Sequence, residues 1–177
     1  MRPPLVVGLS SAPRGLDPHL YNDFVSFEVC ANAFEGLTRL DRNLGVEPAL
    51  AESWSSPDEL TWHFRLRSGV RFHDGRELQA ADVVFSIERA RSHPRSEFRG
   101  YLVSVRAVRA LGPRGVEIVT ERPSPLLLNR LSFIGVVPAG GPDEIREPIG
   151  SGPFRLHATG KDPCLRWGET FPGAGAC

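Results

Sequence analysis

The sequence predicts a mixed α/β (α+β) fold, in which helices and strands follow one another along 177 residues. Two patterns carry this prediction. Apolar side chains recur at every second position from Trp62 onward, which is the period of a half-buried strand. Over Ala80–Ser92 they recur at helical spacing instead, and Asp82 lies in the first turn, where the helix dipole favours a negative charge. An amphipathic helix is therefore expected to pack against β-hairpins.

The stretch Thr61–Gly75, TWHFRLRSGVRFHDG, is predicted to form a hairpin with an apolar inner face and a basic outer face. Ser68-Gly69 would supply its turn and Asp74-Gly75 a second one. In such a hairpin His63 and His73 face each other, near enough for one metal ion to touch both. Zinc needs three or four protein ligands, and only Asp74 stands nearby, so a solvated polar face is favoured over a metal site.

Other segments follow from spacing and turn residues. They are a strand at Leu5–Leu9, a helix from Ser26 to Phe34 with Gly36 at its end, a second hairpin within Tyr101–Thr120, a short helix Pro125–Leu131 with Ser124 as its cap, and a strand after the glycine turn of IGSGPFRL.

The composition excludes several classes of protein. The chain has 21 basic and 21 acidic residues, which alternate rather than form blocks, so no nucleic acid is expected as a partner. The start, MRPPLVVGLSSAPRG, has an apolar run too short for the core of a signal peptide. The cysteines form no CxxC pair, so neither a disulfide framework nor a zinc knuckle is indicated. Cys30, in the run FEVCANAF, is expected to be a buried thiol.

A set of colinear motifs carries a family resemblance. Residues 50–86, LAESWSSPDELTWHFRLRSGVRFHDGRELQAADVVFS, resemble the signature region of the family 5 extracellular solute-binding proteins, which are the peptide, oligopeptide and nickel receptors of bacterial ABC importers. VGLSSAPRGLDPH resembles the family's first strand and its turn, FEGLTRLD the helix end that enters the small lobe, and PIGSGPFRL the glycine-rich return. The resemblance spans about residues 5–157, the N-terminal part of such a protein.

The resemblance implies a receptor without cofactor or catalytic residues, of the type II periplasmic-binding kind. Its partners would be a peptide or other small solute and an ABC permease in the inner membrane, and its location periplasmic or extracytoplasmic. Residues 1–37 and 150–157 would form a partial first lobe, 38–149 a small inserted α+β domain, and 158–177 an unassigned coil. The second lobe would be missing from this chain, so the chain by itself could not clamp a ligand from both sides.

By position in the resemblance, two segments are candidates for ligand contact. One is the loop after LDPH, and the other is the EFRGYL segment of the small lobe. The six candidate residues are Tyr21, Asn22, Asp23, Phe24, Phe98 and Tyr101. Four of them have an alternative role: Phe24 and Tyr101 as core aromatics, and Asn22 and Asp23 as caps of the following helix.

Other functions remain alternatives to peptide binding. LDPHLY also resembles the nickel-receptor form of this loop, in which the tyrosine faces a metal chelate. The tryptophan and arginine of that branch have no match here, since Phe98-Arg99-Gly100 and Phe133-Ile134-Gly135 occupy those regions. A hydrolase is disfavoured, because Ser151 lacks the flanking pattern of a nucleophile elbow and His157 alone makes no triad. A fragment without a function of its own is the third alternative.

Overall fold

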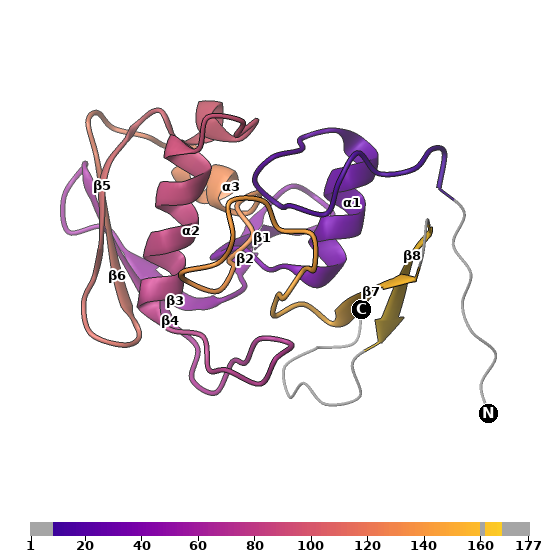
Figure 1. Ribbon diagram of the computed structural model, residues 1–177. Helices are drawn as coiled ribbons and strands as arrows, with labels where there is room; N and C mark the ends of the chain where they lie inside the picture. Colours follow the sequence, from indigo (N-terminus) through magenta and orange to yellow (C-terminus); the bar gives the residue numbers. More distant parts are fainter. Residues whose placement is uncertain (1–8, 160–161, 168–177) are drawn as a thin grey trace.

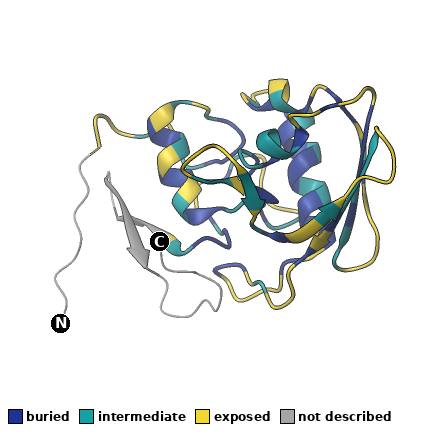
Figure 2. Ribbon diagram, turned by 180° about the vertical axis from the view of Figure 1, so that it is seen from behind, coloured by how far each residue is buried: buried dark blue, intermediate teal, exposed yellow. Residues whose placement is uncertain are grey.

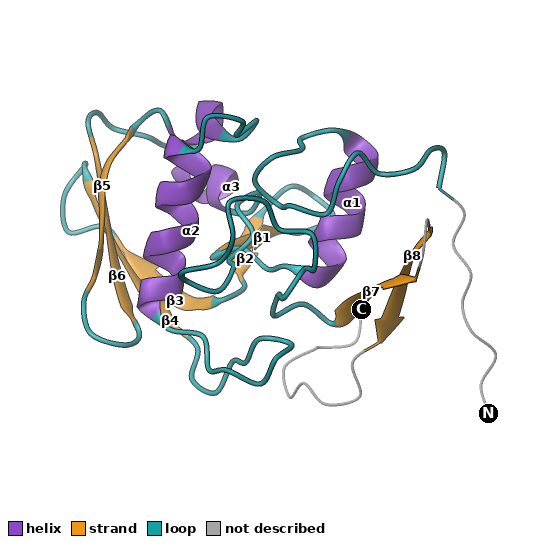
Figure 3. Ribbon diagram, viewed as in Figure 1, coloured by secondary structure: helices purple, strands orange, loops and turns teal. Residues whose placement is uncertain are grey.

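The computed structural model describes residues 9–159 and 162–167, and it confirms the mixed α/β fold (Figures 1 and 3). The described strands form one four-stranded sheet and two two-stranded sheets. In chain order the elements are α1 (Phe24–Ala33), β1 (Thr38–Leu40), β2 (Val46–Pro48), β3 (Ala51–Ser55), β4 (Thr61–Leu66), α2 (Ala80–Ser92), the 3-10 helix η1 (Arg99–Leu102), β5 (Val105–Ala110), β6 (Gly115–Thr120), α3 (Leu127–Leu131), β7 (Phe154–Thr159) and β8 (Asp162–Trp167).

The central sheet is antiparallel and has the strand order β3-β4-β6-β5. In β4, Phe64 and Leu66 are buried and Arg65 between them is exposed, as the alternating pattern predicts. Strands β5 and β6 form the predicted second hairpin, whose turn contains Gly112 at a φ of +75°. A left-handed backbone of this kind favours glycine.

The predicted hairpin over Thr61–Gly75 is wrong in its second half. Only β4 is a strand, and its neighbours are β3 and β6, while residues 70–75 form a loop with one isolated bridge between Arg71 and Glu77. The side chain of Phe72 is fully buried in the main core from this loop. Burying an aromatic ring contributes about 1.5–3 kcal/mol, and here it holds the segment inside without strand pairing.

Helix α2 has the predicted bounds, because its start is specified locally. The backbone N–H of Gln79 donates to Asp82 Oδ2 at 2.8 Å, and the backbone N–H of Asp82 donates to the backbone oxygen of Gln79 at 3.0 Å in return. This reciprocal pair satisfies backbone groups that have no partner inside a helix. Val83, Ile87 and Ala90 form the buried side of α2, which packs on β5 and β6 (Figure 2).

Three further predictions are corrected or stay open. The predicted start and cap of the short helix are wrong: α3 begins at Leu127, Leu126 occupies the cap position, and the Ser124 hydroxyl bonds to that of Ser104 at 3.0 Å. The predicted coil over 158–177 is wrong for β8, which pairs with β7. The predicted strand Leu5–Leu9 lies outside the described residues except for Leu9, which is in a loop.

Two apolar clusters fill the interior. The larger one lies between the central sheet, α2 and α3, and the smaller one joins Val29, Cys30, Ala33 and Phe34 of the α1 region to Val137 and Ile145. The smaller cluster therefore connects the predicted partial lobe to the predicted inserted domain, whose boundaries stay a prediction. Among the described helices, none has the length and apolar character to cross a bilayer.

Candidate functional site

Tyr21 and Asn22 lie in the loop before α1, where polar contacts fix them. The Tyr21 ring packs on Gly15, at which a Cβ would come within 2.1 Å of the ring, and Arg14 stacks over it at 5.2 Å. The Tyr21 hydroxyl donates to Glu144 Oε1 at 3.4 Å. The backbone N–H of Asn22 donates to Glu97 Oε2 at 2.7 Å. The loop is thus held against segments more than 70 residues away in the sequence.

Asp23 and Phe24 form the start of α1. Asp23 Oδ1 accepts from the backbone N–H of Ser26 at 3.0 Å, which confirms that Asp23 caps the helix. Partial burial raises the pKa of the Asp23 carboxyl, but hydrogen bonds from Ser26 and the charge of Arg14 outweigh it, so the pKa lies below its ordinary value. Phe24 is 73% exposed, so the alternative of a core aromatic is wrong for this residue.

Phe98 and Tyr101 belong to a row of aromatic rings. Phe98 is fully buried and contacts half-buried Tyr101 with ring centroids 5.6 Å apart. Tyr101 contacts Phe133 at 5.3 Å, and Phe133 contacts Phe27 of α1 at 5.4 Å. Rings at these separations attract one another beyond simple burial. The row therefore connects η1 in the core to the surface of α1, and Phe98 has no surface of its own to offer a solute.

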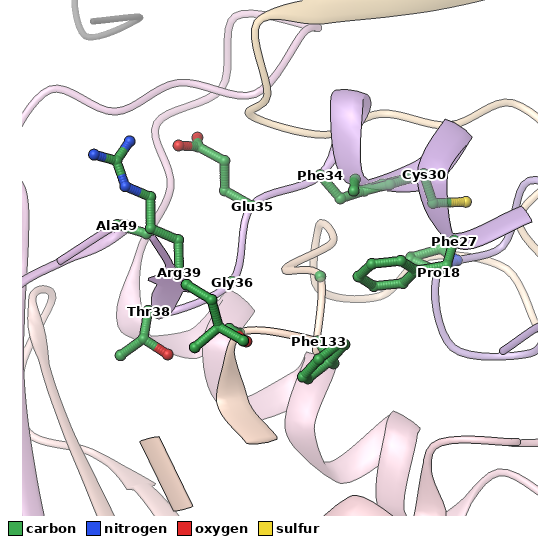
Figure 4. A pocket seen from close by; sticks show the side chains of 14 residues that line it. Pro18, Phe27, Cys30, Phe34, Glu35, Gly36, Thr38, Arg39, Ala49 and Phe133 are labelled. Atoms are coloured by element: carbon green, nitrogen blue, oxygen red, sulfur yellow. The ribbon is translucent and has the colours of Figure 1, made fainter. Parts of the chain in front are cut away.

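The end of this row forms one wall of a pocket of about 350 Å³ between α1, β1 and the segment after α3 (Figure 4). Phe27 and Phe133 stand at one side, and Glu35 and Arg39 stand at the other. The lining is largely apolar and comes from Pro18, Phe27, Cys30, Ala31, Phe34, Glu35, Gly36, Thr38, Arg39, Leu40, Ala49, Ser132, Phe133 and Gly135. Pockets of this size and character are typical of small-molecule sites.

Glu35 brings a carboxyl group to this pocket. Burial raises its pKa, and a hydrogen bond from the Ser151 hydroxyl at 2.9 Å with the charges of Arg67 and Arg39 offsets part of that rise. Arg39 itself is 67% exposed and forms an ion pair with Glu47 at 2.8 Å. Cys30, which also lines the pocket, is a buried free thiol as predicted, and burial raises its pKa to about 12.

Pro18, one of the residues that line the pocket, has a buried polar network on its inner side, away from the pocket. Arg89 of α2 donates two hydrogen bonds to the Asp17 carboxylate, at 2.9 and 2.6 Å, and a third to Nδ1 of His19 at 2.9 Å. Because Nδ1 accepts, Nε2 carries the proton and donates to the backbone oxygen of Gly135 at 2.8 Å. Burial lowers the pKa of His19 to about 4, so the ring is neutral. The network fixes Pro18 and Gly135, which line the pocket.

His73 occupies a different place from the one predicted. It is buried, and its Nε2 donates to the backbone oxygen of Gly152 at 2.9 Å while Nδ1 accepts from Gly150 N at 3.2 Å. His63 lies opposite Glu117 in the β4–β6 register and contacts it at 3.2 Å. The expectation that both histidines share an outer face is therefore wrong. Within residues 9–159 and 162–167, no group of three potential metal ligands occurs.

The pocket contains residues that the sequence did not single out, namely Phe27, Phe133 and Glu35. Phe27 is one of several apolar residues in a helix, and nothing local separates it from the core. None of the six predicted contacts lines the pocket. Phe98 and Tyr101 belong to the aromatic row, the other four lie in the loop before α1 and at its start, and their role in binding stays a prediction.

Comparison with known proteins identifies the family. The sequence model described as "Bacterial extracellular solute-binding proteins, family 5 Middle" matches residues 45–163. A glutathione-binding protein, GsiB, of Escherichia coli O1:K1 / APEC is 32% identical over 162 residues, covering 86% of this chain and 31% of GsiB.

Two solved structures extend the comparison. NikZ from Campylobacter jejuni in complex with Ni(L-His) has a TM-score of 0.75 at 31% identity, covering 85% of this chain and 32% of NikZ. The periplasmic binding protein DppA from Helicobacter pylori, in complex with the peptide STSA, has a TM-score of 0.79 at 27% identity, covering 91% of this chain and 38% of DppA. The chain spans about a third of the length of these relatives and has the fold of the corresponding part of type II periplasmic binding proteins. It belongs to the family 5 bacterial extracellular solute-binding proteins.

Proposed function

We propose that this chain is part of a receptor that binds peptides for an ABC importer. The observation that carries the proposal is the pocket walled by Phe27 and Phe133 in a chain of this family. Extended peptides are bound through backbone hydrogen bonds, with roomy apolar pockets for their side chains. The loop at Tyr21–Phe24 would run along the peptide, and the pocket would receive one of the peptide's side chains.

The location and partner follow from the same proposal. A receptor of this family would work outside the cytoplasmic membrane and deliver its solute to an ABC permease. Catalysis is no part of the proposal, because the relatives are binding proteins by name. The hydroxyl of Ser151 donates to a carboxyl group, Glu35, rather than to a histidine base.

A metal chelate is the second candidate solute. It is favoured by the likeness to NikZ, whose structure contains Ni(L-His), and by the LDPHLY loop. A chelate brings its own ligands for the metal, so it requires few from the protein. Tyr21 would contact the chelate in this case.

Calorimetric titration of the chain distinguishes the candidates. The solutes are a defined pool of di- to pentapeptides, glutathione, and nickel with histidine. Micromolar binding of peptides supports the proposal, and heat with nickel and histidine alone supports the second candidate. If no solute gives a binding heat, the chain does not bind as an independent unit. This result would contradict the proposal that the chain itself binds peptides. Substitution Phe27→Ala should weaken peptide binding, whereas Val103→Ala, an exposed position in another part of the fold, should leave it unchanged.

A further inference from the structure

We infer that the pocket receives a ligand group that combines an apolar or aromatic face with a positive charge, and that it rejects carboxylates. The inference rests on the proposed function and names the chemistry of one subsite. It depends on two features, the aromatic wall and the charges that line the pocket.

The aromatic wall favours an apolar or cationic group. Phe27 and Phe133 are both half-buried, with rings 5.4 Å apart and tilted by 38°. The apolar parts of Pro18 and Phe34 continue this lining. A ring or alkyl chain placed here removes apolar surface from water, and each Å² so buried contributes about 25 cal/mol. The faces of phenyl rings also attract cations and repel anions.

The two charged residues that line the pocket differ in whether they have an ion-pair partner. Of the two charged residues in the lining, Arg39 is already neutralised, because its Nη2 and Nε lie 2.8 and 2.9 Å from Glu47 Oε2. Glu35 has no ion pair within the described part of the chain. Its hydrogen-bond partner is the neutral hydroxyl of Ser151. Arg67 acts on Glu35 only at longer range, and its Nε donates to the backbone oxygen of Ala49.

An incoming cation would supply the partner that Glu35 lacks. Glu35 is half-buried, so its interaction with an ammonium group is screened less than that of an exposed pair. A carboxylate in the same place would face a like charge at one end of the pocket and the negative faces of two rings at the other. Both effects act in the same direction, and they separate ligands of equal size by charge alone.

Three probes of nearly the same shape test this inference on the isolated chain. They are 2-phenylethylamine, 2-phenylethanol and 3-phenylpropionate, which carry a cation, a neutral group and an anion on one phenyl ring. Binding is measured by NMR as chemical-shift changes of the Phe27 and Phe133 rings. We expect the amine to bind at least threefold more tightly than the alcohol, and the alcohol more tightly than the acid.

Two variants assign the preference to its causes. Glu35→Gln should bring the affinities of the amine and the acid together, while Phe133→Leu should weaken all three probes. Glu28→Gln removes the same charge from the exposed side of α1, outside the pocket, and should preserve the order. Denaturation curves of each variant show whether it is folded.

The inference is overturned if the acid binds the wild-type chain as tightly as the amine, or if Glu35→Gln leaves the order unchanged. It is also overturned if no probe shifts the two rings. Peptide titration separates these results from the proposed function. If peptides bind without any preference for a positive charge, the inference fails and the proposed function stands. If the probes follow the expected order but no peptide binds, the subsite stands and the proposed function fails.

Discussion

The buried network on the inner side of Pro18 and the pocket on its outer side differ in how their polar groups are satisfied. On the inner side, Asp17, His19 and Arg89 are all buried and bonded to one another. On the outer side lies the pocket, where Glu35 has no ion pair within the described residues. A buried charge without a partner costs several kcal/mol, so loss of either charged partner on the inner side should destabilise the fold. On the outer side, the Glu35 carboxyl group can still form an ion pair with a ligand, as a binding site requires.

The largest effect is expected from breaking the inner side. Arg89→Met leaves the Asp17 carboxylate buried without its cation, and the free energy of unfolding should fall by about 3–5 kcal/mol. The measurement is urea denaturation followed by circular dichroism. Arg65→Met is the matched control, because Arg65 forms an exposed ion pair with Glu52 at 2.7 Å and should cost at most about 1 kcal/mol. Equal losses in the two variants would contradict the contrast between the two sides.

The second effect concerns protonation of the inner side. The pKa of His19 is lowered from 6.5 to about 4 because burial disfavours the charged ring, so the unfolded chain binds the proton more readily. Its contribution to stability is complete above about pH 6.5 and is lost as the pH falls towards 4, by up to about 3 kcal/mol. His19→Gln should flatten the pH dependence of the unfolding free energy in this window. The same slope in both proteins would refute this role of His19.

The third effect tests how tightly the backbone is packed next to the open pocket. A Cβ at Gly150 would lie 1.9 Å from the backbone oxygen of Ala33, so Gly150→Ala must displace the end of α1. Overpacking of this kind costs about 1–3 kcal/mol, measured as the shift of the denaturation midpoint. Gly100→Ala meets no heavy atom within 4 Å and serves as the control. If Gly150→Ala is as stable as Gly100→Ala, the backbone next to the pocket is not tightly packed and the prediction is wrong.

The smallest effect is expected at Phe24. This residue is 73% exposed at the start of α1, so Phe24→Ala should change the unfolding free energy by no more than about 0.5 kcal/mol. The same truncation at fully buried Phe98 is the positive control for the measurement. A large loss at Phe24 would show that it belongs to the packed part of the protein. A small loss leaves its side chain available for the predicted contact with a solute.

Features that depend on neighbours along the chain could be predicted from the sequence. Helix α2 has its predicted bounds because Gln79 and Asp82 cap it within one turn. The burial of Phe64 and Leu66 follows from the strand period, and the β5–β6 hairpin follows from its glycine turn. The family followed from many colinear motifs.

Contacts between groups far apart in the sequence could not be predicted in this way. The strand predicted after Gly69 does not form, because both edges of β4 are already paired, with β3 and with β6. Arg89 reads as one more charge on an amphipathic helix, yet it is buried against Asp17, 72 residues earlier. The pocket joins Phe27 to Phe133, which are far apart in the chain. The physical reason is that local propensity fixes periods and caps, whereas burial and the pairing of buried polar groups depend on the whole packed chain.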